Sequence, residues 1–83
     1  MIEIQSRQNA ALKHLARLGR ERKYRRSTGE MLCEGEKMLT EALRSGAEIK
    51  TVLVRRGFES GELRQAEKQG AAMYCAEGAL FCL

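Results

Sequence analysis

The amino-acid sequence predicts an α/β fold with a small, mostly parallel sheet. Two observations lead to this expectation. Short apolar runs alternate with segments whose apolar residues recur at helical spacing, and glycines stand between these segments rather than inside them. A strand–helix–strand–helix–strand order favours right-handed crossovers, and therefore parallel strands covered by helices. The chain has 83 residues, which is the size of one domain.

The N-terminal part of the chain predicts a helix that follows a short extended stretch at residues 1–5. Ser6 and Asn9 are good helix-start residues, because their side-chain oxygens can accept hydrogen bonds from the first-turn N–H groups. Leucines at positions 12, 15 and 18 then fall on one side of a helix over residues 10–19. This helix either stops near Gly19 or resumes through Tyr24, and a break near Gly19 would let Arg22 turn outward.

The remaining elements follow in alternation. We expect strands at residues 31–33, 49–54 and 71–76, and helices at residues 36–45 and 59–69. Gly46 and Gly70 are natural helix ends, since glycine accepts the left-handed conformation there. Glu34 and Gly35 form the turn between the first of these strands and its helix. Another helix could begin at Glu77.

Positive charge is concentrated in the N-terminal segment. Between Arg7 and Arg26 the chain holds eight Lys or Arg residues and a single acid, Glu21, although the net charge of the whole chain is only +4. A helix face that is merely solvated normally mixes charges of both signs. The concentration of one sign therefore favours a polyanionic partner, and we interpret the segment as a surface for RNA or DNA.

The candidate nucleic-acid-binding residues all belong to this segment. They are Ser6, Asn9, Lys13, Arg17, Arg20, Arg22, Lys23, Tyr24, Arg25 and Arg26. Position alone argues only for helix capping by Ser6 and Asn9. Tyr24 could stack on an unpaired base while its neighbours hold phosphates, or it could anchor the end of the helix to the sheet. Arg55 and Arg56 could extend the basic surface or merely carry loop charge.

The sequence contains no recognisable catalytic or metal-binding motif. It has no aspartate and one histidine, His14, which we expect at the surface without a neighbouring acid. The three cysteines lack the spacing of zinc ligands, and Cys33 and Cys75 are expected as reduced thiols inside strands. Glu34 is expected to pair with an arginine of the basic segment, and Gly35 to supply a conformation that other residues avoid.

Four motifs follow one another along the chain. They are Ser6-x-x-Asn9-x-x-Leu12-Lys13-x-Leu15-x-x-Leu18, Arg22-Lys23-Tyr24-Arg25, Gly29-Glu30-Met31-Leu32-Cys33-Glu34-Gly35 and Leu43-x-Ser45-Gly46. This ordered set resembles the N-terminal substrate-binding domain of the SpoU/TrmH family of RNA ribose 2′-O-methyltransferases, and the likeness covers essentially the whole chain. One departure is Ala10, where the family often has proline.

The resemblance implies a three-layer α/β/α sandwich of the ribosomal L30e type. It implies that residues 1–83 form an RNA substrate-binding domain, a fragment of a longer protein, which presents RNA to a knotted catalytic domain after residue 83. That domain would bind S-adenosylmethionine and form a homodimer, and ribosomal RNA is preferred to transfer RNA as the target. The family's recurrent positions are matched by Ser6, Asn9, Lys13, Arg22, Arg25, Glu34 and Gly35.

The chain itself is therefore expected to hold no cofactor and no metal and to catalyse nothing alone. No apolar run approaches the length of a membrane span, and no signal peptide is recognisable, so a cytoplasmic location is expected. Two alternatives remain open at this point. The chain could be a stand-alone RNA-binding protein of the L30e type, or a protein-interaction module that dimerises through residues 79–83.

Overall fold

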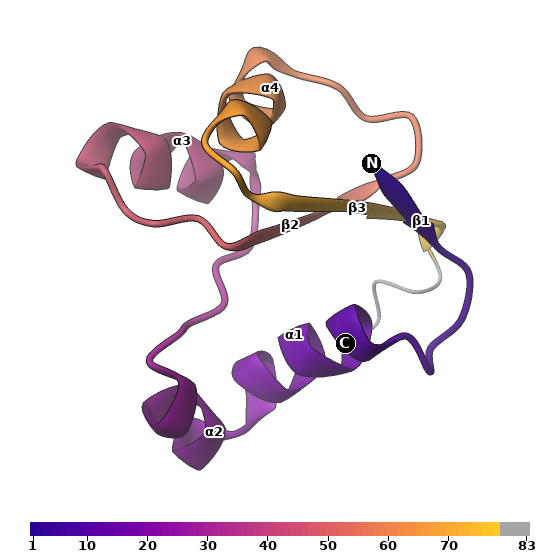
Figure 1. Cartoon of the computed structure of the whole chain (residues 1–83), viewed down its shortest axis with the longest axis vertical. Coiled ribbons are helices and arrows are strands. Elements are labelled where there is room, and N and C mark those ends of the chain that lie inside the picture. The colour runs from indigo at the N-terminus through magenta and orange to yellow at the C-terminus, as the bar shows by residue number, and fades with distance from the viewer. Residues whose placement is uncertain (79–83) are drawn as a thin grey trace.

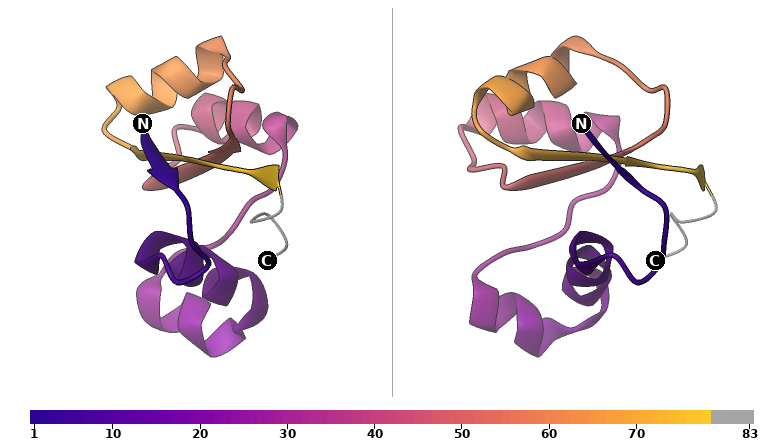
Figure 2. Two further views of the ribbon diagram at one scale, coloured as in Figure 1. Left: turned by 90° about the vertical axis from the view of Figure 1, so that its right-hand side faces the viewer. Right: turned by 45° about the vertical axis from the view of Figure 1, so that its right-hand side comes forward.

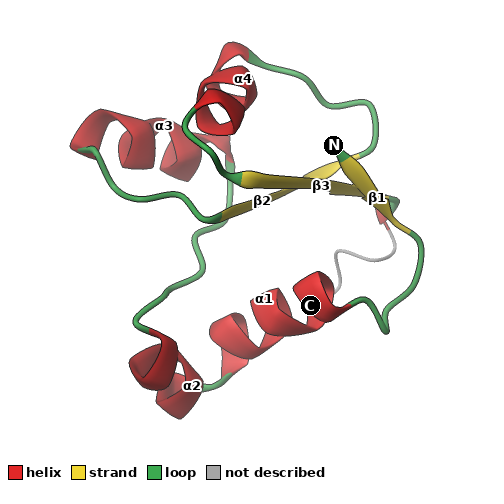
Figure 3. Cartoon of the chain, viewed as in Figure 1, coloured by secondary structure: helices red, strands yellow, loops and turns green. Residues whose placement is uncertain are grey.

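Three strands and four helices are formed by residues 1–78. The computed structural model describes residues 1–78, and Figures 1 and 3 show their arrangement. In chain order the elements are β1 (Ile2–Ile4), α1 (Ala10–Arg20), α2 (Arg22–Thr28), α3 (Glu36–Ser45), β2 (Thr51–Arg55), α4 (Gly61–Lys68) and β3 (Ala72–Ala76).

The three strands form one parallel sheet with the order β1-β3-β2. β3 lies in the centre and pairs with both neighbours; for example, Leu53 of β2 and Ile2 of β1 are both opposite Tyr74. Because side chains alternate between the two faces of a sheet, this register sends Val52 and Met73 to one face and Leu53 and Tyr74 to the other.

Each face of the sheet is covered by helices, which confirms the predicted three-layer α/β/α sandwich (Figure 2). On one face, Val52 and Met73 are buried against Leu63 and Ala66 of α4. The partly buried Leu39 of α3 packs on the same cluster. The opposite face is covered by α1, where Leu12 belongs to a second apolar cluster.

The second cluster joins α1 to the sheet. Leu12 is buried together with Ile4 of β1 and Ala76 of β3, and Leu53 and Tyr74 pack against them. The other two leucines of the predicted stripe, at positions 15 and 18, are also buried. The leucine spacing therefore identified the sheet-facing side of α1, and the opposite side is left to the cations.

The helix ends follow the predicted capping residues in most places. The Asn9 side chain accepts hydrogen bonds from the N–H groups of Ala11 and Leu12 and so caps α1. Ser6 instead closes the turn before the helix, since its hydroxyl accepts from the N–H of Gln8 at 3.1 Å. Gly46 ends α3 in the left-handed conformation, as expected.

The strand predicted at residues 31–33 is absent, and this prediction is wrong. β1 pairs with β3 at one side of the sheet and β2 pairs with it at the other, so residues 31–34 run outside the sheet from α2 to α3. Met31 is 72% exposed and Cys33 is also exposed, which corrects the expectation of a buried thiol. Three apolar residues in a row favour a strand only when a pairing edge is available to them.

Two further helix predictions concern the start of α4 and the end of the described chain. The helix expected over residues 59–69 begins at Gly61, because the Ser60 hydroxyl caps it by accepting from the N–H of Leu63. The helix expected from Glu77 onward falls almost wholly outside the described residues, and the dimerisation segment suggested at residues 79–83 lies outside them altogether.

Candidate nucleic-acid interface

The outer side of the α1–α2 layer carries a group of exposed cations that form no hydrogen bond or ion pair in the described part of the chain, although the charge of Arg20 contributes to the lowered pKa of its neighbour Glu21. Lys13 and Arg20 lie on α1, and three more belong to α2, where helical geometry resumes after a break. We call these five residues the open cations: their charged ends are exposed, and no hydrogen bond or ion pair joins them to another residue within 1–78. They are Lys13, Arg20, Arg22, Lys23 and Arg26.

The break between the two helices occurs at Glu21, where the backbone is extended. It begins a new helix at Arg22, and the Arg22 side chain is exposed rather than turned toward the leucine side. The sequence analysis allowed for a helix break that would turn Arg22 outward, but it expected the break near Gly19. The second helix ends at Gly29, whose φ of 71° is left-handed.

Arg17 is held within the chain by two neighbours. Its guanidinium donates to both carboxylate oxygens of Glu21 at 3.2 and 3.3 Å, and it lies 3.8 Å from the centre of the Tyr24 ring. The hydrogen bond with Glu21 raises the pKa of Arg17, and the same bond lowers the pKa of Glu21. Arg17 thus covers one face of the tyrosine and is partly neutralised.

Tyr24 belongs to a polar network that links α1, α2 and the segment leading to β2. The Nδ1 atom of His14 and the Tyr24 hydroxyl are 2.5 Å apart, and His14 Nε2 is 3.1 Å from Glu30. Since a carboxylate can only accept, Nε2 donates to Glu30, and in the tautomer with its proton on Nε2 the Nδ1 atom accepts a hydrogen bond from the Tyr24 hydroxyl. Lys50 is 3.6 Å from the other oxygen of Glu30.

This network corrects one expectation and changes another. His14 does have an acid beside it, and its hydrogen bond, assisted by the charge of Lys50, lowers the pKa of Glu30. Tyr24 acts as an anchor, but it is bonded to α1 rather than to the sheet, and Arg17 covers its ring. Base stacking by Tyr24 stays a prediction. A base would have to stack on the ring face that Arg17 does not cover, or Arg17 would have to move away.

Arg25 is also engaged inside the chain. Its Nη1 atom donates to the carbonyl oxygen of Leu18 at 2.7 Å, and the side chain is half-buried. The bond satisfies a carbonyl near the end of α1, which the break at Glu21 would otherwise leave unpaired. Arg25 therefore fixes the angle between the two helices.

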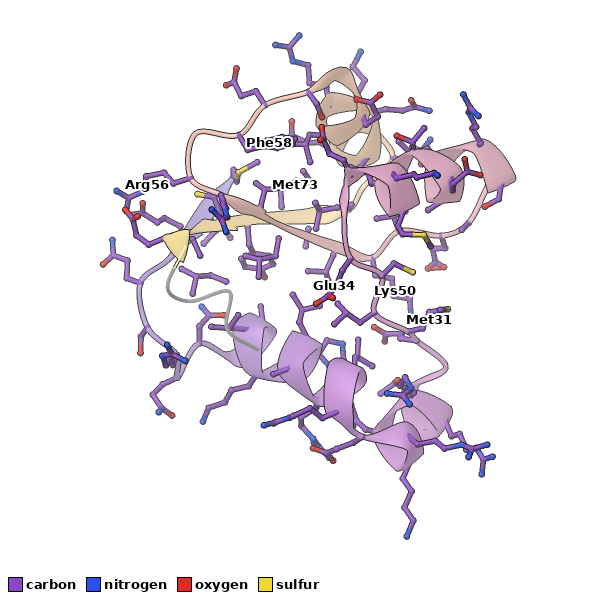
Figure 4. The ribbon with its side chains drawn as sticks, turned by 180° about the vertical axis from the view of Figure 1, so that it is seen from behind. Met31, Glu34, Lys50, Arg56, Phe58 and Met73 are labelled. Carbon is purple, nitrogen blue, oxygen red and sulfur yellow. The ribbon has the colours of Figure 1, made fainter. Side chains whose placement is uncertain are left out.

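Glu34 and Gly35 lie where residues 31–35 return toward the sheet. Gly35 has a φ of 97°, which confirms that this turn needs a glycine. The predicted pairing of Glu34 with an arginine is not found within residues 1–78, where Glu30 and Glu21 make the contacts to the basic layer. Glu34 instead lines a hollow of about 330 Å³ between this segment and the α1–α2 junction. Figure 4 shows Glu34 and Met31 in this region.

Arg55 ends β2 and Arg56 follows it. The structure shows what the charge of Arg56 does. Arg56 forms ion pairs with Glu3 of β1 and, at 2.8 Å, with Glu77 after β3. Arg56 and Glu77 directly follow β2 and β3, and Glu3 lies within β1, so Arg56 links all three strands. Figure 4 labels Arg56. Its charge is balanced locally, which separates it from the open cations.

Neither a metal site nor a membrane-spanning helix is found in the described residues. No group of three or more His, Cys, Asp or Glu side chains within 1–78 is placed to hold a metal ion. Over the same residues, no helix has the length and apolar character that crossing a bilayer would require.

The fold and the cation layer define a small α/β domain with a basic helical face, the class of domain that binds a polyanionic substrate. The chain matches the family model of the MRM3-like substrate binding domain over residues 9–81, and it belongs to that family. The match fits a substrate-binding domain of an RNA methyltransferase. No curated protein and no solved structure matches the chain significantly.

Proposed function

We propose that this domain binds the RNA substrate of a ribose 2′-O-methyltransferase of the SpoU/TrmH type through the outer side of α1 and α2. The observation that carries the proposal is the set of five open cations on one layer, none of them paired with an acid of the described chain. Each bound phosphate would release condensed counterions, so cations kept free of protein partners favour RNA directly.

The other predicted contact residues take different parts in this proposal. Asn9, Arg17, Tyr24 and Arg25 already make hydrogen bonds within the chain, and they hold the two helices at a fixed angle. Cations on hydrogen-bonded helices lose less backbone freedom when RNA binds than cations on flexible loops would.

The catalytic step is proposed to belong to a separate domain of the parent protein. A domain that binds a substrate and offers no recognised catalytic motif acts by positioning, which raises the effective concentration of the RNA beside the reacting groups. S-adenosylmethionine would supply the methyl group in the catalytic domain, and no step of that transfer is assigned to this chain. A homodimeric parent, an L30e-like ancestry and a cytoplasmic location complete the proposal.

The proposal is tested by titrating the chain with ribosomal RNA and transfer RNA fragments at several salt concentrations. We expect submicromolar to micromolar binding at low salt and a steep loss of affinity as salt rises, with a slope set by the number of phosphate contacts. NMR shift mapping should place the largest changes on α1 and α2. Absence of binding to both RNA classes at low salt would refute the RNA-binding role.

The same titration separates the remaining alternatives. A stand-alone RNA-binding protein would bind its target with full affinity without any partner domain, whereas a substrate domain should gain affinity when the catalytic domain is attached. A dimerisation module would sediment as a dimer and show shifts outside α1 and α2. Ribosomal RNA that competes better than transfer RNA would support the preferred target.

A further inference from the structure

The hollow beside the α1–α2 junction has the composition of a site for one flat, partly polar group. Its volume of about 330 Å³ lies at the lower end of the range of small-molecule pockets. Its lining combines apolar side chains with one cation and one acid. The lining residues are Leu18, Gly19, Arg25, Met31, Leu32 and Glu34.

The apolar wall is formed where the chain after α2 folds back over α1. Leu32 packs on Gly19 so closely that a Cβ atom at Gly19 would lie 3.1 Å from its Cδ2 atom. Met31 lines the same hollow and is 72% exposed. A ring that entered the hollow would cover the methionine and remove apolar surface from water.

Arg25 offers a flat surface whose orientation is already fixed. The hydrogen bond from its Nη1 atom to the Leu18 carbonyl holds the guanidinium at the wall of the hollow. Guanidinium planes stack on unpaired nucleobases, and holding the plane in advance lowers the entropy lost on stacking. On the same side of α2, one turn earlier, Arg22 is an open cation that can meet a phosphate next to the stacked base.

Glu34 decides which base the hollow would accept. Its carboxylate makes no hydrogen bond or ion pair within residues 1–78, and a carboxylate offers two acceptors and no donor. Among the four bases, guanine alone presents two adjacent donors, N1–H and the N2 amino group, on its pairing edge. The donors of adenine, cytosine and uracil stand beside acceptors that a carboxylate repels.

We infer that this hollow binds one unpaired guanine of the RNA, stacked on Arg25, with its N1–H and N2 amino groups donating to Glu34. The inference rests on the proposed RNA-binding function and adds a base preference to it. The open cations would supply affinity that is independent of sequence, and the hollow would supply the selection of a nucleotide. Sequence-specific RNA recognition generally uses unpaired bases in this way, because the grooves of an RNA helix hide their edges.

The test compares three RNA hairpins that have the same stem and a uridine loop. One loop carries a single guanosine, the second carries inosine at that place, which lacks the N2 amino group, and the third carries only uridine. The unmodified chain should bind the guanosine hairpin about tenfold more tightly than the uridine hairpin, with inosine between them. Methyl NMR signals of Leu32 and Met31 should shift only with the purine loops.

The Glu34→Gln variant should lose this preference. Glu67→Gln is its matched control, because Glu67 lies on α4 in the opposite layer and the same unit of charge is removed. Glu67→Gln should gain a little affinity for all three hairpins and keep the order of preference. Glu34→Gln should instead bind the guanosine hairpin more weakly than the unmodified chain does, and so bind all three hairpins about equally. Far-UV circular dichroism verifies that each variant is folded.

The outcomes separate the two proposals. Equal, salt-dependent binding of the three hairpins by the unmodified chain would overturn the guanine site and leave the RNA-binding function standing. A preference for guanosine that persists in Glu34→Gln would also overturn it. If none of the hairpins binds at low salt, the guanine site fails together with the RNA-binding function.

Discussion

The two helical layers of this domain both pack on the sheet through apolar side chains, but the charges on their solvent-exposed sides differ. Each layer buries leucine against its own face of the sheet. On the outside, however, α3 and α4 each carry two acids and two cations, whereas residues 10–28, which span α1 and α2, hold seven cations and one acid. The balanced layer is typical of a solvated surface, where neighbouring charges offset one another.

The difference separates what stabilises the fold from what serves a partner. The acid-poor layer gives up pair stabilisation on its surface and compensates with polar bonds at its helix junction. Three of these bonds, made by Arg17, His14 and Arg25, cross from α1 to the break or to α2. The balanced layer has no comparable need, because α3 and α4 are joined through β2.

The largest expected effect tests whether the two layers are equal in packing. Leu12 and Leu63 are each 4% exposed, one in each layer. Replacing either with alanine should lower the free energy of unfolding by about 2–5 kcal/mol, because a buried side chain is lost and a cavity remains. Urea denaturation measures both. A much smaller loss for Leu12→Ala than for Leu63→Ala would mean that α1 is not packed as described.

The second prediction tests whether the layers differ in RNA binding. Neutralising Arg22, Lys23 and Arg26 to glutamine should lower RNA affinity about tenfold or more at low salt. The slope of log K against log salt should become shallower by about 2, which corresponds to three lost phosphate contacts on single-stranded RNA.

The matched control for this triple variant removes two arginines and one lysine from the other layer. Arg44, Arg64 and Lys68 on α3 and α4 are suitable, since they give the same change in net charge. This control should keep most of the affinity and its salt slope. Equal losses in the two variants would show that only total charge matters.

A smaller effect distinguishes capping from RNA contact at Asn9. Asn9→Ala should lower the free energy of unfolding by about 1 kcal/mol, and Ser60→Ala should do the same for α4. Asn9→Ser keeps an acceptor at the cap and should restore most of the loss. If Asn9 only caps the helix, RNA affinity measured well below the melting temperature stays unchanged in both variants at this position. A fall in affinity for the folded Asn9→Ser protein would add a contact role.

The smallest expected effect concerns pH. The pKa of Glu30 is lowered from its ordinary value of 4.5 by the His14 hydrogen bond and the nearby Lys50. The ionised carboxylate therefore adds stability that is fully present above pH 4.5 and is lost as the pH falls through the lowered pKa. Thermal melts of Glu30→Gln should show a weaker acid dependence in that range than the unmodified chain, while Glu48→Gln should behave like the unmodified chain.

Much of the fold followed from local pattern in the sequence. The helical spacing of Leu12, Leu15 and Leu18 fixed both the existence of α1 and its buried side, and Gly46 marked the end of α3. The failure at residues 31–33 has a non-local cause. A strand forms where a partner edge is available, and β1 occupies a place beside β3 that no local property of residues 31–33 could reveal.

The candidate site was predictable in its charge but not in its contacts. A count of cations and acids located the basic layer, but the exposure of Arg22 depends on the break between α1 and α2, which regular helical geometry does not give. The division into open cations and engaged residues depends on the break at Glu21, which brings Tyr24 to His14 and Arg25 to the Leu18 carbonyl. Single-residue breaks have weak sequence signals, so the roles of Glu30 and Arg25 were missed.

None of the seven residues of α2 is buried, and this affects how easily a protease can cut the chain there. A helix that is held by side-chain hydrogen bonds and not by a core opens at low cost, and a protease cleaves what opens. Five trypsin sites lie at or beside it, at Arg20, Arg22, Lys23, Arg25 and Arg26. Trypsin should therefore cut the chain first in this region. Bound RNA should delay that cut, so digestion becomes a label-free footprint of the interface.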